Sequence, residues 1–288
     1  MSDAAGRAVP TRSRRGVGLL VAAAAVVAAG ALALATVANP RTAALWTVPT
    51  AVVVGWEWRF LRHNAGANHP PGEPGAVATR LGVANAVTLV RGVLYAAVAG
   101  FLLTGGLPGV WAWTPALLYG AGASLDAVDG ALARGPGRPT ALGGKLDLAF
   151  DTLGFLVAPL VGVAWGLLPV WYLSLSAARY LFNLGRWRRR VRGLPVYDLP
   201  DSRVRRPLAG LQMAFIAVAL APVLPTAVVR ALAAVVLVPS LSVFVRDYLV
   251  VAGHLPTRSP EPSHGETGRS TAGDAAATVD RADPTDDD

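Results

Sequence analysis

The chain has 288 residues, of which 53% are hydrophobic and only 15% are charged. Soluble domains of this size carry about a quarter charged residues, so the composition argues against an ordinary soluble enzyme and predicts a polytopic membrane protein. The chain contains no cysteine, which excludes disulfides, thiolate metal sites and a cysteine nucleophile.

The net charge of +8 is divided unevenly along the chain. Residues 253–288 hold eight acidic residues and three arginines without an apolar period, which predicts a disordered acidic tail. The rest of the chain is therefore strongly basic. A basic body can indicate nucleic-acid binding, but membrane proteins also keep arginine in their cytoplasmic loops. We expect membrane lipid as the partner of this charge, and no nucleic acid.

Eight apolar stretches predict eight transmembrane helices and an all-α fold. The first, 16–38, follows three arginines, and the second, 43–58, is shorter and carries tryptophans that we expect to anchor it at the membrane interface. A polar segment rich in proline and glycine then interrupts the pattern. Six core helices are predicted at 86–104, 111–134, 143–166, 168–186, 207–224 and 227–249.

This pattern divides the chain into five segments. They are a basic cytoplasmic arm (1–15), a two-helix membrane extension (16–61), a linker (62–81), a six-helix core (82–252) and the acidic cytoplasmic tail (253–288). With a cytoplasmic N-terminus, eight spans return the C-terminus to the cytoplasm and leave only Arg41 and Arg230 on the outer side. Because this agrees with the positive-inside rule, we expect a multi-pass protein of the cell membrane with both termini cytoplasmic.

Two of the predicted core helices each carry a pair of aspartates. Asp126 and Asp129 are three residues apart, and Asp147 and Asp151 are four apart, so each pair shares one face of its helix. The stretch 135–142 is rich in glycine and proline and predicts a hairpin between the two helices. The hairpin would bring all four carboxylates to one depth below the cytoplasmic surface. Charges placed there are costly and usually functional.

Four carboxylates in a site of low dielectric cannot all stay ionised unaided. Divalent cations would compensate them, and ligands that are all oxygen favour two Mg²⁺ or Mn²⁺ ions, which suit phosphoryl chemistry. The structural alternative is a set of buried ion pairs with Arg134 and Lys145. Small residues at Gly130 and Ala133 allow close approach of a ligand or a helix, and Arg134 can pair with phosphate oxygens.

Together these residues form the pattern Asp126-x-x-Asp129-Gly130-x-x-Ala133-Arg134, eight residues, Gly143-x-x-x-Asp147-x-x-x-Asp151. This pattern resembles the signature of the CDP-alcohol phosphatidyltransferase family (class I, integral membrane), whose eight signature positions all match with the usual spacing. The six-span core, roughly 82–250, also looks like that family. Its members have six transmembrane helices and are often dimers, so the resemblance implies a homodimer. The N-terminal helix pair and the tail lie outside it.

The resemblance implies a role in phospholipid biosynthesis. The enzyme would transfer a phosphatidyl or similar phospho-alcohol group from a CDP-activated lipid, such as CDP-diacylglycerol, to the hydroxyl of a small alcohol, and release CMP. The four aspartates would hold two Mg²⁺ or Mn²⁺ ions, and Asp151 would also be the catalytic base. The cytidine diphosphate part of the donor would be bound by Gly130, Ala133, Arg134 and Gly143.

Four further arginines are candidates to bind a phosphate on the acceptor. Arg91 ends a run, Asn-Ala-Val-Thr-Leu-Val-Arg, that is similar to the start of many family members, and Arg179 lies within an apolar span, where it could instead pair with an aspartate. Arg203 and Arg206 precede the fifth core helix, where family members with phosphorylated acceptors place basic residues. They favour a phosphorylated polyol such as glycerol 3-phosphate or inositol phosphate, although no residue pattern separates these from serine or free inositol.

Two other functions compete with this interpretation. A Mg²⁺-dependent membrane prenyltransferase also uses aspartate motifs, but these should lie far apart on separate helix bundles. A non-enzymatic transporter would carry acidic residues nearer the midplane of several helices, often in repeated halves. Here all four acidic residues lie on one predicted hairpin and no repeat is visible.

Overall fold

The computed structural model describes residues 12–70, 81–133, 140–199, 202 and 204–255, with side chains throughout except at 12–20 and 127–133. Over these ranges the chain forms eight α-helices joined by short 3₁₀ turns, and no strand. The predicted all-α bundle, with two N-terminal helices before six core helices, is confirmed.

Each predicted helix has a counterpart in the structure. The helices are α1 (Arg12–Val37), α2 (Pro40–Asn64), α3 (Val83–Gly100), α4 (Thr114–Ala133), α5 (Ala141–Ala164), α6 (Ser174–Val191), α7 (Arg205–Leu220) and α8 (Thr226–Val251). Two of them begin at a side-chain cap. Asn39 accepts a hydrogen bond from the Thr42 amide at 2.8 Å at the start of α2, and Thr140 accepts one from the Gly143 amide at 3.0 Å at the start of α5.

The largest difference from the predicted ranges is at α6, which we expected to span 168–186. The chain first turns back at Gly166, whose φ of 72° is readily adopted by glycine. A 3₁₀ turn at Val170–Leu173 follows Pro169, and α6 then starts at Ser174 and continues to Val191. The helix is therefore displaced toward its arginine-rich end.

Three of the described helices are long and apolar enough to cross a membrane, at Val83–Leu103, Ala141–Ala164 and Thr226–Val251. A shorter apolar helix covers Val21–Val37. The protein is therefore a multi-pass membrane protein.

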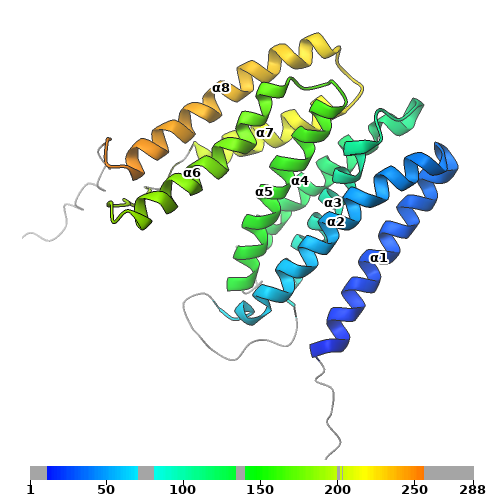
Figure 1. Cartoon of the computed structure of the whole chain (residues 1–288), viewed down its shortest axis with the longest axis horizontal. Coiled ribbons are helices and arrows are strands. Elements are labelled where there is room, and N and C mark those ends of the chain that lie inside the picture. The colour runs from blue at the N-terminus through cyan, green and yellow to red at the C-terminus, as the bar shows by residue number, and fades with distance from the viewer. Residues whose placement is uncertain (1–11, 71–80, 134–139, 200–201, 203, 256–288) are drawn as a thin grey trace, which may run out of the picture.

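Helix α3 is at the centre of the bundle and packs against α2, α4 and α5 (Figure 1). The antiparallel pair α1 and α2 covers one side of it, and α7 packs against α4 on the other, with α6 and α8 beyond (Figure 1). The indole of Trp46 is buried and donates to the carbonyl of Ala97 at 2.9 Å, so it joins α2 to α3. Our expectation of an interfacial anchor at Trp46 was wrong, because sequence position does not show which face of α2 is covered.

The close approach of α4 and α5 to α3 depends on Tyr95. This side chain of α3 is fully buried, and a Cβ atom at Gly122 of α4 or Gly154 of α5 would lie 2.5 Å or 2.7 Å from its ring. The two glycines therefore let both helices contact the ring directly. Gly122 lies one turn before Asp126, and Gly154 lies one turn after Asp151, so the same contact positions the aspartates.

We expect Gly154→Ala to destabilise the protein by about 1–3 kcal/mol, because the added methyl group overpacks an enclosed ring. Thermal unfolding in detergent would measure this. Gly144→Ala on the same helix is the matched control, since a Cβ atom there meets no atom within 4 Å and alanine favours the helix. Equal unfolding temperatures for the two variants would contradict the packing argument.

Candidate functional site

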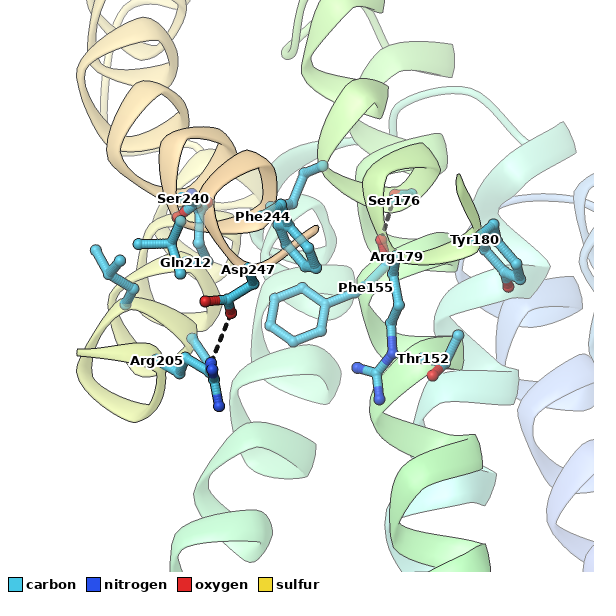
Figure 2. Close-up of a pocket in the computed structure, with 14 residues that line it drawn as sticks. Thr152, Phe155, Ser176, Arg179, Tyr180, Arg205, Gln212, Ser240, Phe244 and Asp247 are labelled. Atoms are coloured by element: carbon cyan, nitrogen blue, oxygen red, sulfur yellow. Dashed lines mark hydrogen bonds and ion pairs between the residues drawn. The ribbon is translucent and has the colours of Figure 1, made fainter. Parts of the chain in front are cut away.

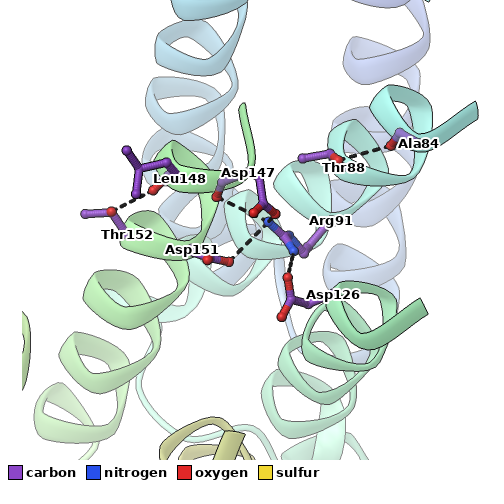
Figure 3. A network of polar contacts seen from close by, with 8 residues as sticks. All are labelled: Ala84, Thr88, Arg91, Asp126, Asp147, Leu148, Asp151 and Thr152. Atoms are coloured by element: carbon purple, nitrogen blue, oxygen red, sulfur yellow. Dashed lines mark hydrogen bonds and ion pairs between the residues drawn. The ribbon is translucent and has the colours of Figure 1, made fainter. Parts of the chain in front are cut away.

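Three of the four predicted aspartates lie together in the structure. Asp126 comes from α4, and Asp147 and Asp151 come from α5. Each is partly buried, and one carboxylate oxygen of each lies within 4.8 Å of those of the other two. Figure 3 shows the three side chains converging from the two helices on a common point. The structure therefore brings these three carboxylates together, as the spacing predicted.

A guanidinium group occupies the middle of this cluster. Arg91 of α3 is fully buried and donates hydrogen bonds to Asp126 and, at 2.7 Å from Nη2, to Oδ1 of Asp147 (Figure 3). The same Nη2 lies 3.2 Å from Oδ1 of Asp151. One arginine thus bridges three carboxylates that belong to two different helices.

Among the described residues, the cation that pairs with the three aspartates is Arg91, whereas the alternative of buried ion pairs named Lys145 and Arg134. Lys145 is exposed and forms no ion pair within the described residues, and Arg134 lies outside them. Arg91 was expected instead to bind an acceptor phosphate. Its guanidinium contacts the aspartates, so its observed contacts do not support that role.

The cluster has the charge and the donor atoms that suit a divalent cation. One guanidinium faces three carboxylates, which leaves an excess of negative charge when all three are ionised. Within the described chain, Oδ1 of Asp151 is buried and, apart from its ion pair with Arg91, has no hydrogen-bond partner. Carboxylate oxygens are the ligands that Mg²⁺ and Mn²⁺ prefer. These residues therefore fit the metal ions implied by the sequence.

The remaining residues of the motif are described less completely. Asp129, Gly130 and Ala133 belong to the last turns of α4, in the part whose side chains lie outside the described set, and Arg134 lies outside the described residues altogether. Their predicted roles stay predictions.

Gly143, in the first turn of α5, has a packing role in the structure. A Cβ atom there would lie 2.6 Å from Oδ1 of Asn85 on α3. Nδ2 of Asn85 also donates to Oγ1 of Thr140 at 3.1 Å. Glycine at this position lets α3 contact the start of α5, and its predicted contact with the donor stays a prediction.

The structure also contains a cavity of about 200 Å³, which we call the arginine cavity. It lies between α5, α6, α7 and α8, and its wall includes Thr152, the residue after Asp151 (Figure 2). Arg205 and Asp247 form an ion pair across it, with Nε 2.6 Å from Oδ2. Arg179 also lines the cavity and forms no ion pair among the residues that the structure describes.

The arginines predicted to bind an acceptor lie in different places in the structure. Arg179 lines the arginine cavity, Arg206 is exposed on α7 outside it, and Arg203 lies outside the described residues. Arg205, which the sequence analysis did not single out, lines the cavity. Leu208, Ala209 and Gln212 of α7 also line the cavity, and they follow Arg205 by three, four and seven residues. Residues at these spacings share a helix face, which was the signal for Arg205 in the sequence.

The sequence model of the CDP-alcohol phosphatidyltransferase family matches residues 81–245, which is more than half of the chain. The chain belongs to this family. Comparison with the curated proteins and with the solved structures gave no match. The matched range runs from α3 into α8, so it includes the aspartates, Arg91 and Arg179.

Membership of the family gives the class of reaction. A CDP-alcohol phosphatidyltransferase transfers a phospho-alcohol group from a CDP-activated donor to an acceptor, and this enzyme is a membrane phosphatidyltransferase of phospholipid biosynthesis. The convergence of carboxylates from α4 and α5 agrees with that chemistry. The prenyltransferase and transporter alternatives are set aside by the match.

Proposed function

We propose that this enzyme transfers the phosphatidyl group of a CDP-activated lipid, such as CDP-diacylglycerol, to a hydroxyl of a phosphorylated polyol and releases CMP. The observation that carries the proposal is that consecutive residues of α5 belong to the aspartate cluster and to the arginine cavity. Asp151 belongs to the cluster, and Thr152 lines the cavity. A donor at the cluster and an acceptor in the cavity would therefore meet at Asp151.

On the donor side, Asp126, Asp129, Asp147 and Asp151 would hold two Mg²⁺ or Mn²⁺ ions. Such ions, when bound, neutralise charge on the diphosphate and on the leaving CMP. We further propose that Gly130, Ala133, Arg134 and Gly143 contact the cytidine diphosphate part of the donor. The presence of the complete motif, with the family's spacing, supports this assignment.

On the acceptor side, Asp151 would act as the general base. An acceptor hydroxyl in the arginine cavity would lie beside its carboxylate, which would take the proton as the oxygen attacks the donor phosphorus. Arg91 would orient this carboxylate, since it lies 3.2 Å from Oδ1 of Asp151 and also binds Asp126 and Asp147.

The charges of the arginine cavity favour an acceptor with one anionic group. Asp247 neutralises Arg205, whereas Arg179 forms no ion pair within the described chain and interacts with Asp151 only at longer range. Arg179 would then bind the phosphate of the acceptor, and polar side chains such as Ser176 and Asp247 would bind its hydroxyl groups. Glycerol 3-phosphate and inositol phosphate both fit this description.

Release of CMP by the purified protein in detergent tests the proposal. CDP-diacylglycerol and Mg²⁺ or Mn²⁺ would be supplied with glycerol 3-phosphate, inositol phosphate, inositol or serine in turn. We expect CMP release that depends on the metal and on one phosphorylated acceptor. Release with serine or free inositol alone would overturn the acceptor assignment, and no release with any acceptor would overturn the donor assignment.

Arg179→Gln should raise the KM for the phosphorylated acceptor about 10–100-fold, because it removes a charge-assisted hydrogen bond to phosphate. The KM for CDP-diacylglycerol should change little. Arg206→Gln is the matched control, since Arg206 is exposed and outside the cavity. If both variants changed the acceptor KM equally, Arg179 would have no special role.

We also propose that the enzyme is a homodimer with both termini in the cytoplasm. The family resemblance supports the first statement, and the distribution of arginine along the sequence supports the second. Cross-linking in native membranes and accessibility of terminal tags would test them separately.

A further inference from the structure

A groove of about 590 Å³ lies between the N-terminal helix pair and the core. Its walls come from α1, α2 and α3 and are almost entirely apolar, with side chains such as Ala23, Val26, Leu61, Val90 and Leu94. It shares no lining residue with the arginine cavity. Both α1 and α2 lie entirely outside the range that matches the family, so the known reaction assigns no task to this groove.

Among the described residues that line the groove, one side chain is ionisable, Glu57 of α2. Glu57 is only 6% exposed, and its Oε1 has no hydrogen-bond partner among the described residues. A carboxyl group buried against apolar surface is unfavourable unless a hydrogen-bond donor meets it. Ionisable residues inside membrane helices usually mark a functional site for the same reason.

The depth of Glu57 is set by its contact with α3. A Cβ atom at Gly92 would lie 2.9 Å from Oε1, so the carboxyl group lies level with Arg91 and therefore with the aspartate cluster. A ligand that meets Glu57 must carry its donor group at this depth. The phosphate of the CDP-activated lipid reaches the same level in the proposed reaction.

The length of the groove favours a hydrocarbon chain. Its lining residues on α3 run from Ala86 to Leu94, which is about 12 Å along a helix, and Leu81 lies just before α3 begins. A helix of a partner protein would need a groove of about 30 Å to follow it across the bilayer. At the end of α2, Arg62 lies 5.9 Å above the ring of Trp58, which lines the groove, so the groove is apolar along its length and basic beside one end.

We propose that this groove binds a membrane lipid that carries a free hydroxyl group next to its hydrocarbon chains, as diacylglycerol does. A chain would lie along α3, and the hydroxyl would donate a hydrogen bond to Glu57. A phosphate or an ammonium group carries charge and would be more costly to bring to this depth than a neutral hydroxyl. The proposal does not depend on the acceptor or on the chemistry at Asp151.

Photolabelling of the full chain in phosphatidylcholine nanodiscs tests this site. The probe is a diacylglycerol with a diazirine in one acyl chain, and its matched control is the same molecule acetylated at the free hydroxyl. We expect labelled peptides in α1 or α3 and at least about 10-fold more labelling by the diacylglycerol. Glu57→Leu should abolish this difference. Glu57→Gln should keep part of it, because the amide oxygen still accepts, and Val52→Leu, an exposed change on α2 outside the groove, should leave it unchanged.

Several results would overturn the proposal. They are equal labelling of the wild-type protein by the two probes, an unchanged difference in Glu57→Leu, and labels confined to α6–α8. The comparison of the two probes on the wild-type protein holds even if a Glu57 variant does not fold.

Because the chain has no cysteine, Val90→Cys also provides a single thiol in the groove. Disulfide-linked dimers of that variant in nanodiscs would show that a second copy covers the groove, against the proposal.

Discussion

Replacing Asp151 with asparagine is expected to lower CMP release about 10²–10⁴-fold while the helix bundle stays folded. Asparagine keeps the size of the side chain but cannot take the proton of the acceptor hydroxyl. The measurement is kcat for CMP release, together with the unfolding temperature of the same preparation. Asp198→Asn is the matched control, because Asp198 is exposed in the segment after α6 and away from the cluster.

The metal dependence of each variant separates a base from a metal ligand. For Asp126→Asn we expect activity to recover in part when Mn²⁺ is raised, because the variant weakens a site that other carboxylates still form. For Asp151→Asn we expect no recovery at any metal concentration. Unchanged turnover of Asp151→Asn would refute its assignment as the base, and a large drop in unfolding temperature would point to a structural role instead.

The second large effect is expected at Arg91. Arg91→Leu should destabilise the protein by about 3–5 kcal/mol, because removal of one partner leaves partly buried carboxylates uncompensated. A divalent cation that binds the folded protein would compensate the same charges. Mg²⁺ should therefore raise the unfolding temperature of Arg91→Leu more than that of the wild-type protein.

Two further variants give this experiment its controls. Arg91→Lys keeps the charge but loses the planar fork that reaches several carboxylates, so an intermediate stability is expected. Arg206→Leu removes an exposed arginine and should change little. If Mg²⁺ stabilised the wild-type protein and Arg91→Leu equally, the ion and Arg91 would not act on the same carboxylates.

Much of this protein follows from local patterns in the sequence. The apolar stretches and their proline and glycine breaks predict eight helices, and the structure contains eight within its described range. The spacing of Asp126, Asp147 and Asp151 about a predicted hairpin places their carboxylates together, as the structure confirms. Both predictions succeed because helix periodicity and a tight connection determine the relative positions of residues that are near in sequence.

The partners of these residues were decided by the packing of distant helices. Arg91 is 35 residues from Asp126 and 56 from Asp147, and only the contact of α3 with both motif helices brings them together. The choice of Arg205 rather than Arg206 for the arginine cavity depends on the rotation of α7. The start of α6 and the burial of Glu57 and Trp46 likewise depend on neighbouring helices. Side-chain direction around a helix and the face that a neighbour covers are set by tertiary contacts, which local periodicity does not encode.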